Sequence, residues 1–177
     1  HYFDDIAPHL RRELNIEPRQ FPQNIKHWQD QIDQTLAISI HVRRGDYLRH
    51  PNHHVCTAAY YKRAIEFMRG RFSSAHFFVF SDDIAWCQER FTGENISIVN
   101  HTDHFERPLI DFWLMGRCQH HIIANSTFSW WPAWLNSNSS KLVVAPNRWS
   151  HDPMLNSRAM ADTIPQNWIK IDVDHNC

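Results

Sequence analysis

Five short apolar runs, separated by segments with helical periodicity, constrain this chain more than any other feature of its sequence. The runs are nearly continuous in hydrophobic residues, as strands buried on both faces of a parallel sheet require; they span residues 36–42, 75–81, 96–99, 121–124 and 141–145. The intervening segments predict helices over 58–72, 84–91, 107–119 and 127–135. Strands that alternate with helices imply right-handed βαβ crossovers and therefore a Rossmann-like, doubly wound parallel sheet of the α/β class.

Two of the predicted helices carry additional local signals. Thr57 stands where the N-cap of the 58–72 helix is expected. Trp130, Trp131 and Trp134 are expected to pack the 127–135 helix onto the sheet. Ahead of the first strand, residues 1–35 are polar, with short helical stretches over 9–14 and 25–32.

Composition excludes several classes of function. The 177 residues include 18 Lys+Arg and 19 Asp+Glu, so the net charge of −1 lacks the basic excess that binds nucleic acid through its phosphates. No apolar run approaches the ~20 residues of a membrane span, and residues 1–35 are too polar for a signal peptide. The chain is therefore expected to be cytoplasmic, with its four widely spaced cysteines reduced. A Golgi membrane anchor in a longer parent protein stays an open alternative.

Polar residues cluster where the predicted strands end, which is the edge at which parallel α/β sheets bind ligands. Arg43 and Arg44 follow the first strand, and a guanidinium fork suits the oxygens of a phosphate. Asn125, Ser126 and Thr127 open the helix after the fourth strand, where backbone N–H groups and the helix dipole attract anions. Together, the two arginines and this helix start predict a site that binds a diphosphate. The glycine-rich GxGxxG and GxxxxGK patterns of common nucleotide sites are absent from the sequence.

Other polar clusters leave alternatives open. Ser81-Asp82-Asp83 could hold a metal, accept hydrogen bonds from a guanine, or cap the helix that begins at residue 84. A metal-dependent hydrolase is an alternative function, because histidines occur in three clusters that could bind a metal, although none has the spacing of a zinc site. The clusters are His50/His53/His54, His101/His104 and His120/His121.

Three segments occur in the order of the three motifs of the α-1,2-fucosyltransferases, which this chain resembles over about residues 36–150. They are His41-Val-Arg-Arg-Gly-Asp-Tyr47, Ser81-Asp-Asp83 and Ile123-Ala-Asn-Ser-Thr-Phe-Ser-Trp-Trp131. The resemblance implies the C-terminal half of a GT-B glycosyltransferase, in which two Rossmann-like domains face each other across a cleft. Residues 36–177 would then be the GDP-fucose-binding domain, and residues 1–35 a remnant of the acceptor-side domain or an interdomain segment.

The family's activity and the roles of its motif residues follow from the same resemblance. It implies inverting transfer of L-fucose from GDP-β-L-fucose to the 2-hydroxyl of a galactose-terminated glycan, with no metal and no cofactor. Arg43 would contact the β-phosphate and Arg44 would support it. The guanine would lie near His41, Asp82 and Asp83, and the phosphates near Asn125, Ser126, Thr127 and Ser129.

The catalytic residues implied are Arg43, Arg44 and Asp46. The general base for the acceptor hydroxyl is left open, with Asp46, Asp111 and several histidines as candidates.

Only about 35 residues precede the first motif, too few for a second Rossmann-like domain, so the chain is expected to be a fragment or a truncated product. The cleft face that an absent partner domain would leave exposed predicts self-association or peripheral membrane association. A non-catalytic nucleotide-sugar or glycan-binding module is the alternative from a different functional class.

Overall fold

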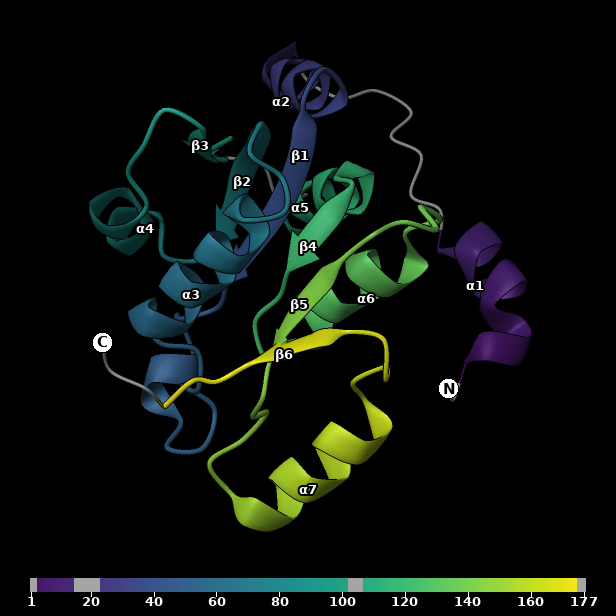
Figure 1. Cartoon of the computed structure of the whole chain (residues 1–177), viewed down its shortest axis with the longest axis vertical. Coiled ribbons are helices and arrows are strands. Elements are labelled where there is room, and N and C mark those ends of the chain that lie inside the picture. Colours follow the sequence, from purple (N-terminus) through teal and green to yellow (C-terminus); the bar gives the residue numbers. More distant parts are fainter. Residues whose placement is uncertain (1–2, 15–22, 102–106, 175–177) are drawn as a thin grey trace.

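The computed structural model describes residues 3–14, 23–101 and 107–174. A six-stranded sheet runs through its centre in the order β3-β2-β1-β4-β5-β6, and every strand pair is parallel (Figure 1). The strands are β1 (Leu36–Val42), β2 (Ala75–Ser81), β3 (Ile96–Ile98), β4 (His120–Ile122), β5 (Val143–Pro146) and β6 (Ile169–Ile171). The predicted Rossmann-like, doubly wound sheet is confirmed.

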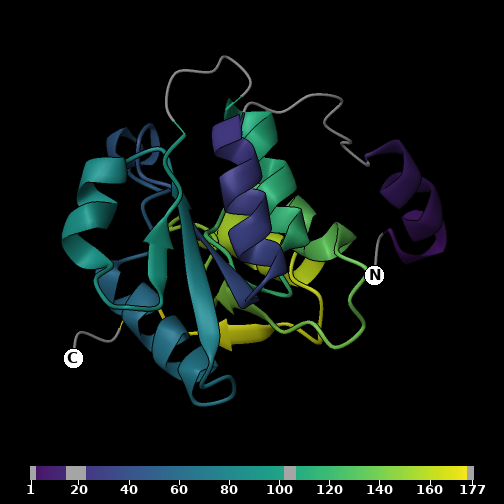
Figure 2. The same ribbon diagram turned by 90° about the horizontal axis from the view of Figure 1, so that it is seen from above.

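Helices cover both faces of this sheet (Figure 2). The helix α3 (Ala58–Arg69) and the helix α4 (Ile84–Arg90) lie on one face, and the helices α2 (Gln23–Asp33), α5 (Arg107–Arg117) and α6 (Thr127–Leu135) lie on the other. The remaining elements are α1 (Ala7–Glu13), α7 (Pro153–Asp162) and the 3-10 turns η1 (Asp4–Ile6) and η2 (Tyr47–Arg49).

The strand β1 separates the two layers of the core. Its side chains alternate between faces, so Ile38 and Ile40 pack with α3 while Ala37 packs with α2 and α5. Thr57 caps α3 as predicted, because its hydroxyl accepts the backbone N–H of Tyr60.

The other predicted packing features are also present. Trp130 and Trp134 are buried with Val143 of β5 and with Ile123, which directly follows β4, whereas Trp131 is only partly buried beside them. Cys56, Cys87 and Cys118 are free and buried, and burial raises the pKa of Cys56 to about 12 and that of Cys87 to about 11. These three cysteines are the reduced thiols that the sequence predicted; Cys177 lies outside the described residues.

Sequence reasoning misplaced some strand ends and missed two elements. β4 spans His120–Ile122, whereas the sequence predicts a strand over 121–124. β5 begins at Val143, two residues after its predicted start at residue 141. α7 has no buried residue and therefore no apolar stripe to reveal it. β6 is a three-residue edge strand interrupted by an exposed lysine, which leaves too short a pattern to recognise.

The N-terminal segment packs against the domain that follows it. Ile25 and Ile32 of α2 are fully buried among residues of β1 and α5, and Ala7 of α1 lies against α6. The assignment of residues 1–35 to an acceptor-side remnant or an interdomain segment stays a prediction. Across the described part of the chain, no helix combines the length and hydrophobicity needed to cross a bilayer.

Candidate functional site

A cavity of about 510 Å³ opens at the carboxyl ends of β2, β1 and β4. These strands are neighbours, and the direction of strand order reverses between β1 and β4, which is where ligands bind in open α/β sheets. Six of the residues predicted from sequence line this cavity: His41, Arg43, Asp46, Asp82, Ser126 and Thr127. The topology therefore brings together residues that lie up to 86 positions apart in the chain, from 41 to 127.

Arg43 is the central cation of the cavity. Its Nη2 lies 2.7 Å from Asp46 Oδ1, and its Nη1 lies 3.0 Å from Asp82 Oδ2. The ring of Tyr47 lies 5.5 Å from the guanidinium carbon, within the range of a cation–π contact. The guanidinium is thus oriented by three neighbours and is one-third exposed.

Arg44 points away from the cavity. Its Nε donates to Asp83 Oδ2 at 3.0 Å, and its guanidinium lies 4.2 Å from the centre of the Trp86 ring. The Arg44 guanidinium, followed by the Trp86 N–H, holds the pKa of Asp83 below its usual value. Asp83 also caps α4. Neither Arg44 nor Asp83 lines the cavity, so both support the loop that carries Arg43.

The start of α6 forms the opposite wall. Ser126 is the N-cap and accepts the N–H of Phe128, while the exposed Thr127 begins the helix at the cavity. Ser129 is buried and donates to the Ser126 carbonyl at 3.3 Å, so its hydroxyl does not reach the cavity. The three N–H groups that follow Thr127 in the helix already donate to Ser126, so what the start of α6 directs at this space is its positive dipole and the Thr127 side chain.

The Asn125 side chain connects three loops and is only 3% exposed. Its Nδ2 donates to the carbonyls of His53 and Trp149, each at 2.9 Å, and its Oδ1 lies 3.5 Å from Cys56 Sγ. Tyr47 Oη in turn donates to the Asn125 carbonyl at 3.2 Å. Asn125 therefore fixes the position of the cavity walls without lining the cavity.

His41 is buried at the end of β1 with its ring 5.3 Å from that of Phe128. Burial, followed by the charge of Arg43, lowers the pKa of His41 to about 3, so the imidazole is neutral at pH 7. Its Nδ1 has no hydrogen-bond partner among the described residues. A buried ring nitrogen without a partner, in a residue that lines the cavity, is a position for a hydrogen bond to a ligand.

Two further charged residues line the cavity: Arg107, which sequence reasoning did not name, and Asp111, which it named as a candidate base. Arg107, at the start of α5, donates from Nη2 to the Ser81 carbonyl at 2.8 Å. Asp111 lies one turn later, with its Oδ1 2.7 Å from Nε2 of the buried His101 and its Oδ2 3.7 Å from Arg107 Nε. The (i, i+4) spacing of Arg107 and Asp111 on a helix that follows β3 is the signal that could have found them.

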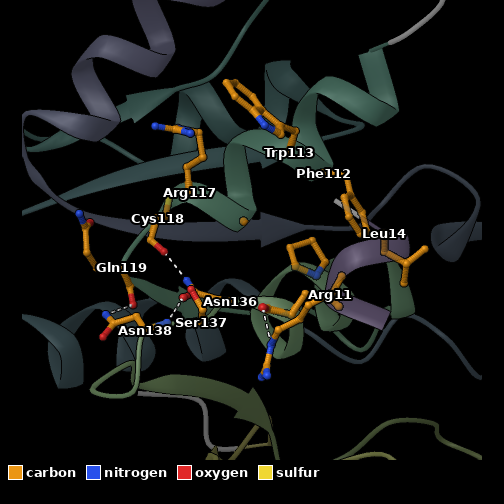
Figure 3. Close-up of a pocket in the computed structure, with 13 residues that line it drawn as sticks. Arg11, Leu14, Phe112, Trp113, Arg117, Cys118, Gln119, Asn136, Ser137 and Asn138 are labelled. Carbon is orange, nitrogen blue, oxygen red and sulfur yellow. Dashed lines mark hydrogen bonds between the residues drawn. The ribbon is translucent and has the colours of Figure 1, made fainter. Parts of the chain in front are cut away.

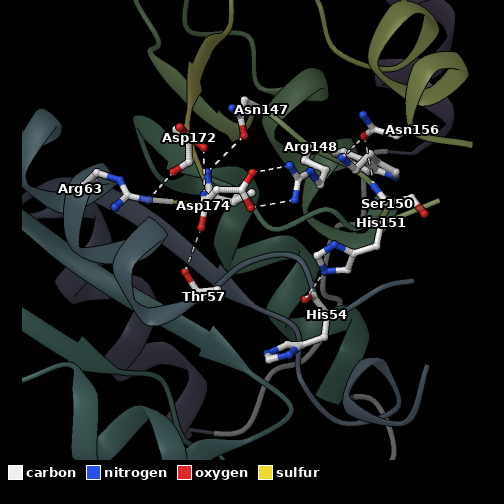
Figure 4. A network of polar contacts seen from close by, with 12 residues as sticks. His54, Thr57, Arg63, Asn147, Arg148, Ser150, His151, Asn156, Asp172 and Asp174 are labelled. Atoms are coloured by element: carbon white, nitrogen blue, oxygen red, sulfur yellow. Dashed lines mark hydrogen bonds and ion pairs between the residues drawn. The ribbon is translucent and has the colours of Figure 1, made fainter. Parts of the chain in front are cut away.

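Polar contacts also join the loops after β5 and β6 to the loop after η2 (Figure 4). His151 Nε2 lies 3.0 Å from the His54 carbonyl, Ser150 donates to the Asn52 carbonyl, and Arg148 pairs with Asp174. These contacts tie the three loops together outside the cavity, whose lining includes none of these residues.

The three histidine clusters do not assemble a metal site in the described residues. No group of three or more His, Cys, Asp or Glu side chains among them is arranged to hold a metal ion. His50 and His53 stack on each other at 3.8 Å, and His120 and His121 bind partners within the fold. His104 lies outside the described residues.

A second cavity, of about 540 Å³, lies at the opposite, amino-terminal ends of β4 and β5 (Figure 3). Several of its polar side chains are engaged by neighbouring backbone. Asn136 Nδ2 donates to the Cys118 carbonyl, Asn138 Nδ2 to the Gln119 carbonyl, and Arg11 Nε to the Leu135 carbonyl. These contacts satisfy backbone carbonyls at the ends of helices and strands. None of the residues predicted to bind the donor lines this second cavity.

Comparison with known sequences identifies the family. The chain matches the sequence model of glycosyl transferase family 11 over residues 2–172. It belongs to that family. Among relatives, an alpha-1,2-colitosyltransferase of Escherichia coli is 39% identical over 153 residues, which cover 83% of this chain and 51% of the relative.

Other family 11 relatives match shorter stretches. The O-antigen biosynthesis glycosyltransferase WbnK of Escherichia coli is 41% identical over 118 residues, which cover 64% of this chain and 39% of WbnK. Galactoside alpha-(1,2)-fucosyltransferase 2 of Pongo pygmaeus is 36% identical over 103 residues, which cover 55% of this chain and 30% of that enzyme. The chain thus spans about half or less of the length of these relatives.

Proposed function

We propose that this chain is the donor-binding half of a GT-B glycosyltransferase that transfers L-fucose from GDP-β-L-fucose to the 2-hydroxyl of a galactoside, with inversion. The observation that carries the proposal is the cavity between β1 and α6, where Arg43 faces the N-terminus of a nine-residue helix. A guanidinium fork opposite the positive end of a helix dipole is suited to a diphosphate. The membership in family 11 supports the reaction class.

Leaving-group stabilisation is the main catalytic contribution proposed for these residues. The bond between C1 of fucose and the β-phosphate oxygen breaks, and its electron pair leaves on GDP. Arg43 and the start of α6 offset the charge that develops there, and Arg44 holds the Arg43 loop through Asp83. Removing one preorganised donor of this kind typically costs ~3–4 kcal/mol of transition-state stabilisation.

Asp46 is the proposed general base. The acceptor oxygen attacks C1 from the face opposite to GDP and passes its proton to a carboxylate. Asp46 is two-thirds exposed at the rim, where an incoming glycan can reach it, whereas Asp111 is one-tenth exposed and is held by His101. Burial lowers the pKa of His41 to about 3, too low for a base of useful strength at pH 7.

Guanine recognition is proposed for His41 and Asp111. A carboxylate accepts the N1–H and N2–H₂ donors of guanine, which adenine does not present in the same pattern. The prediction from sequence assigned this role to Asp82 and Asp83. Asp83 does not line the cavity and binds Arg44 and the Trp86 N–H. Asp82 and Asp111 both line it, but the two oxygens of Asp82 bind Arg43 and the Arg44 N–H at 3.0 and 2.9 Å. Asp111 is favoured because its Oδ2 has only a longer contact, 3.7 Å from Arg107 Nε.

A second donor, GDP-colitose, is favoured by one specific observation. The relative that matches 83% of this chain is named a colitosyltransferase, and colitose is L-fucose without its 3-hydroxyl group. The proposed diphosphate and guanine contacts are common to both donors, so discrimination between them depends on contacts around C3 of the sugar.

Calorimetric titration with GDP-fucose, GDP-colitose, GDP, UDP and ADP tests the proposal, with and without a chelator. The expected result is binding of the guanine nucleotides, insensitive to chelator, with weaker binding of UDP and ADP. Absence of GDP binding would contradict the donor site, and loss of binding with chelator would favour a metal-dependent protein.

Incubation of the 177-residue chain with each donor and a panel of galactose-terminated acceptors then separates a catalyst from a binding module. Orientation of the acceptor is worth ~7–11 kcal/mol of barrier lowering, so donor binding without turnover would mean that these 177 residues do not orient the acceptor. Robust turnover by the monomer would show that the chain is a catalyst by itself.

A further inference from the structure

The cation proposed to bind the donor diphosphate already has two anionic partners. Arg43 Nη2 lies 2.7 Å from Asp46 Oδ1, and Arg43 Nη1 lies 3.0 Å from Asp82 Oδ2. Both carboxylates line the same cavity. A phosphate that approaches these Nη groups therefore competes with both carboxylates for the guanidinium and is repelled by their negative charge.

The two carboxylates differ in how firmly they are held. Asp82 is only 26% exposed, and its Oδ1 accepts the backbone N–H of Arg44 at 2.9 Å. Gly45 packs so closely that a Cβ there would lie 2.8 Å from Asp82 Oδ2. Asp82 is therefore an internal anchor for the loop after β1 and for Arg43.

Asp46 has no comparable support. Its side chain is 66% exposed, and although it precedes η2, it makes no capping hydrogen bond. The contact that holds its carboxylate is the ion pair with Arg43, three residues earlier in the chain. An exposed pair of this type is weak, because water and salt screen it and ordering the side chains costs entropy.

From this asymmetry we infer that Asp46 is a built-in competitor of the donor phosphate on Arg43. Asp46 is paired with Nη2 in the structure, and on donor binding the diphosphate takes its place while Asp82 stays on Nη1. This inference rests on the proposed function, since it assumes that the anion at Arg43 is the donor diphosphate. Asp46 thereby lowers the affinity for the donor.

The exchange also couples donor binding to the chemistry proposed for Asp46. While it is paired with Arg43, the carboxylate is occupied by the guanidinium and does not face an incoming acceptor hydroxyl. Release by the diphosphate leaves it exposed beside the bound sugar. The base thus becomes available when the donor is in place.

Calorimetric titration with GDP tests the inference on the chain and on its Asp46→Asn variant. Because an exposed ion pair contributes up to a factor of about five to an equilibrium constant, the variant is expected to bind GDP about two- to fivefold more tightly. The matched control is Asp174→Asn, which removes a half-exposed aspartate paired with Arg148 and lying outside the cavity, and which is expected to leave the affinity unchanged.

Two further measurements separate competition from a general effect of charge. In an Arg43→Met background, Asp46→Asn is expected to give no gain, since the competed group is gone; a gain that persists would overturn the inference. A structure of the GDP complex is expected to show Asp46 beyond hydrogen-bonding distance of Arg43, and an intact pair beside bound phosphate would also overturn it.

The outcomes distinguish this inference from the proposed function. Binding of GDP by the unmodified chain with equal or weaker binding by Asp46→Asn contradicts the inference alone. Failure of both proteins to bind GDP contradicts the donor site and removes the inference with it. If the Asp46→Asn variant binds GDP and the unmodified chain does not, the result supports the inference, with competition strong enough to prevent binding.

Discussion

The side-chain amide of Asn125 donates from Nδ2 to the backbone carbonyl of Trp149 at 2.9 Å. A second hydrogen bond of the same length, from the same nitrogen, reaches the His53 carbonyl. One buried amide therefore joins the loops that leave β1, β4 and β5, on which much of the candidate site is built.

Replacing Asn125 by alanine is expected to act mainly on stability. It should lower the free energy of unfolding and have a smaller effect on ligand binding. Two partly buried carbonyls lose their donor, and a loss of this kind costs up to ~1–3 kcal/mol where the group is shielded from water. Urea unfolding measures the loss. The matched control is Thr127→Ala, two residues along at an exposed cavity position, which is expected to weaken GDP binding with little change in stability. Equal unfolding energies for Asn125→Ala and the unmodified chain would show that the amide does not hold the loops.

Arg43→Ala is expected to weaken GDP binding more than Arg43→Lys. Lysine keeps the positive charge but loses the fork geometry that contacts two oxygens at once. Calorimetry on the three proteins gives the order directly. Equal affinities would remove Arg43 from the donor site.

The fold could be predicted from sequence because the residues that build it form regular patterns. β1 and β2 coincide with the predicted runs, since each is a seven-residue apolar segment buried on both faces. The helix α6 also has its predicted ends, with Ser126 as the N-cap. By contrast, β4 begins with His120 and His121, whose buried rings accept from the Leu142 N–H and contact Ser39. A polar pair at a strand start carries no apolar signal.

The candidate site could be predicted in part, because motif residues show which side chains are present and not where they point. Arg43 and Arg44 are adjacent in sequence, yet only Arg43 lines the cavity while Arg44 lies on Trp86. Asn125 similarly lies in the motif but points into the protein. Arg107 reaches the cavity from α5 through a tertiary contact with the Ser81 carbonyl, and its (i, i+4) spacing with Asp111 is the one local sign of it.

Asp111 and Asp83 are the two candidates for the carboxylate that binds guanine, and one variant of each distinguishes between them. Asp111→Asn is expected to reduce the preference for GDP over ADP by about tenfold or more, because an amide presents donors toward the N1–H and N2–H₂ of the base. Asp83→Asn is expected to lower thermal stability, through loss of the Arg44 contact and the α4 cap, and to leave the preference unchanged. The opposite pattern in calorimetry and thermal melts would return the guanine contact to Asp83.

Stability is expected to fall as the pH drops from about 6.5 towards 3. Burial, as the largest cause in each, lowers the pKa values of His41 and His121 from 6.5 to about 3, so the unfolded chain takes up two protons in this window that the folded chain does not. Their stabilising contribution is complete above 6.5 and is lost by about 1.4 kcal/mol per histidine per pH unit below it. Urea unfolding at pH 7, 5.5 and 4.5 measures the slope. In a His121→Gln variant the slope should decrease by about one proton; an unchanged slope would mean that His121 does not stay neutral in the folded chain.

Gly45→Ala is expected to weaken GDP binding through Asp82. The new Cβ would lie 2.8 Å from Asp82 Oδ2 and 3.3 Å from its Cγ, so the carboxylate must move away from the Arg44 N–H and from Arg43 Nη1. Loss of one charged hydrogen bond that orients Arg43 corresponds to a weakening of about tenfold. Gly116→Ala is the matched control, since its Cβ meets no atom within 4 Å and alanine stabilises a helix interior by ~0.5–1 kcal/mol. Calorimetry should therefore separate the two alanine variants, with GDP affinity reduced only at position 45. If both bind GDP as the unmodified chain does, the position of Asp82 does not control the guanidinium of Arg43.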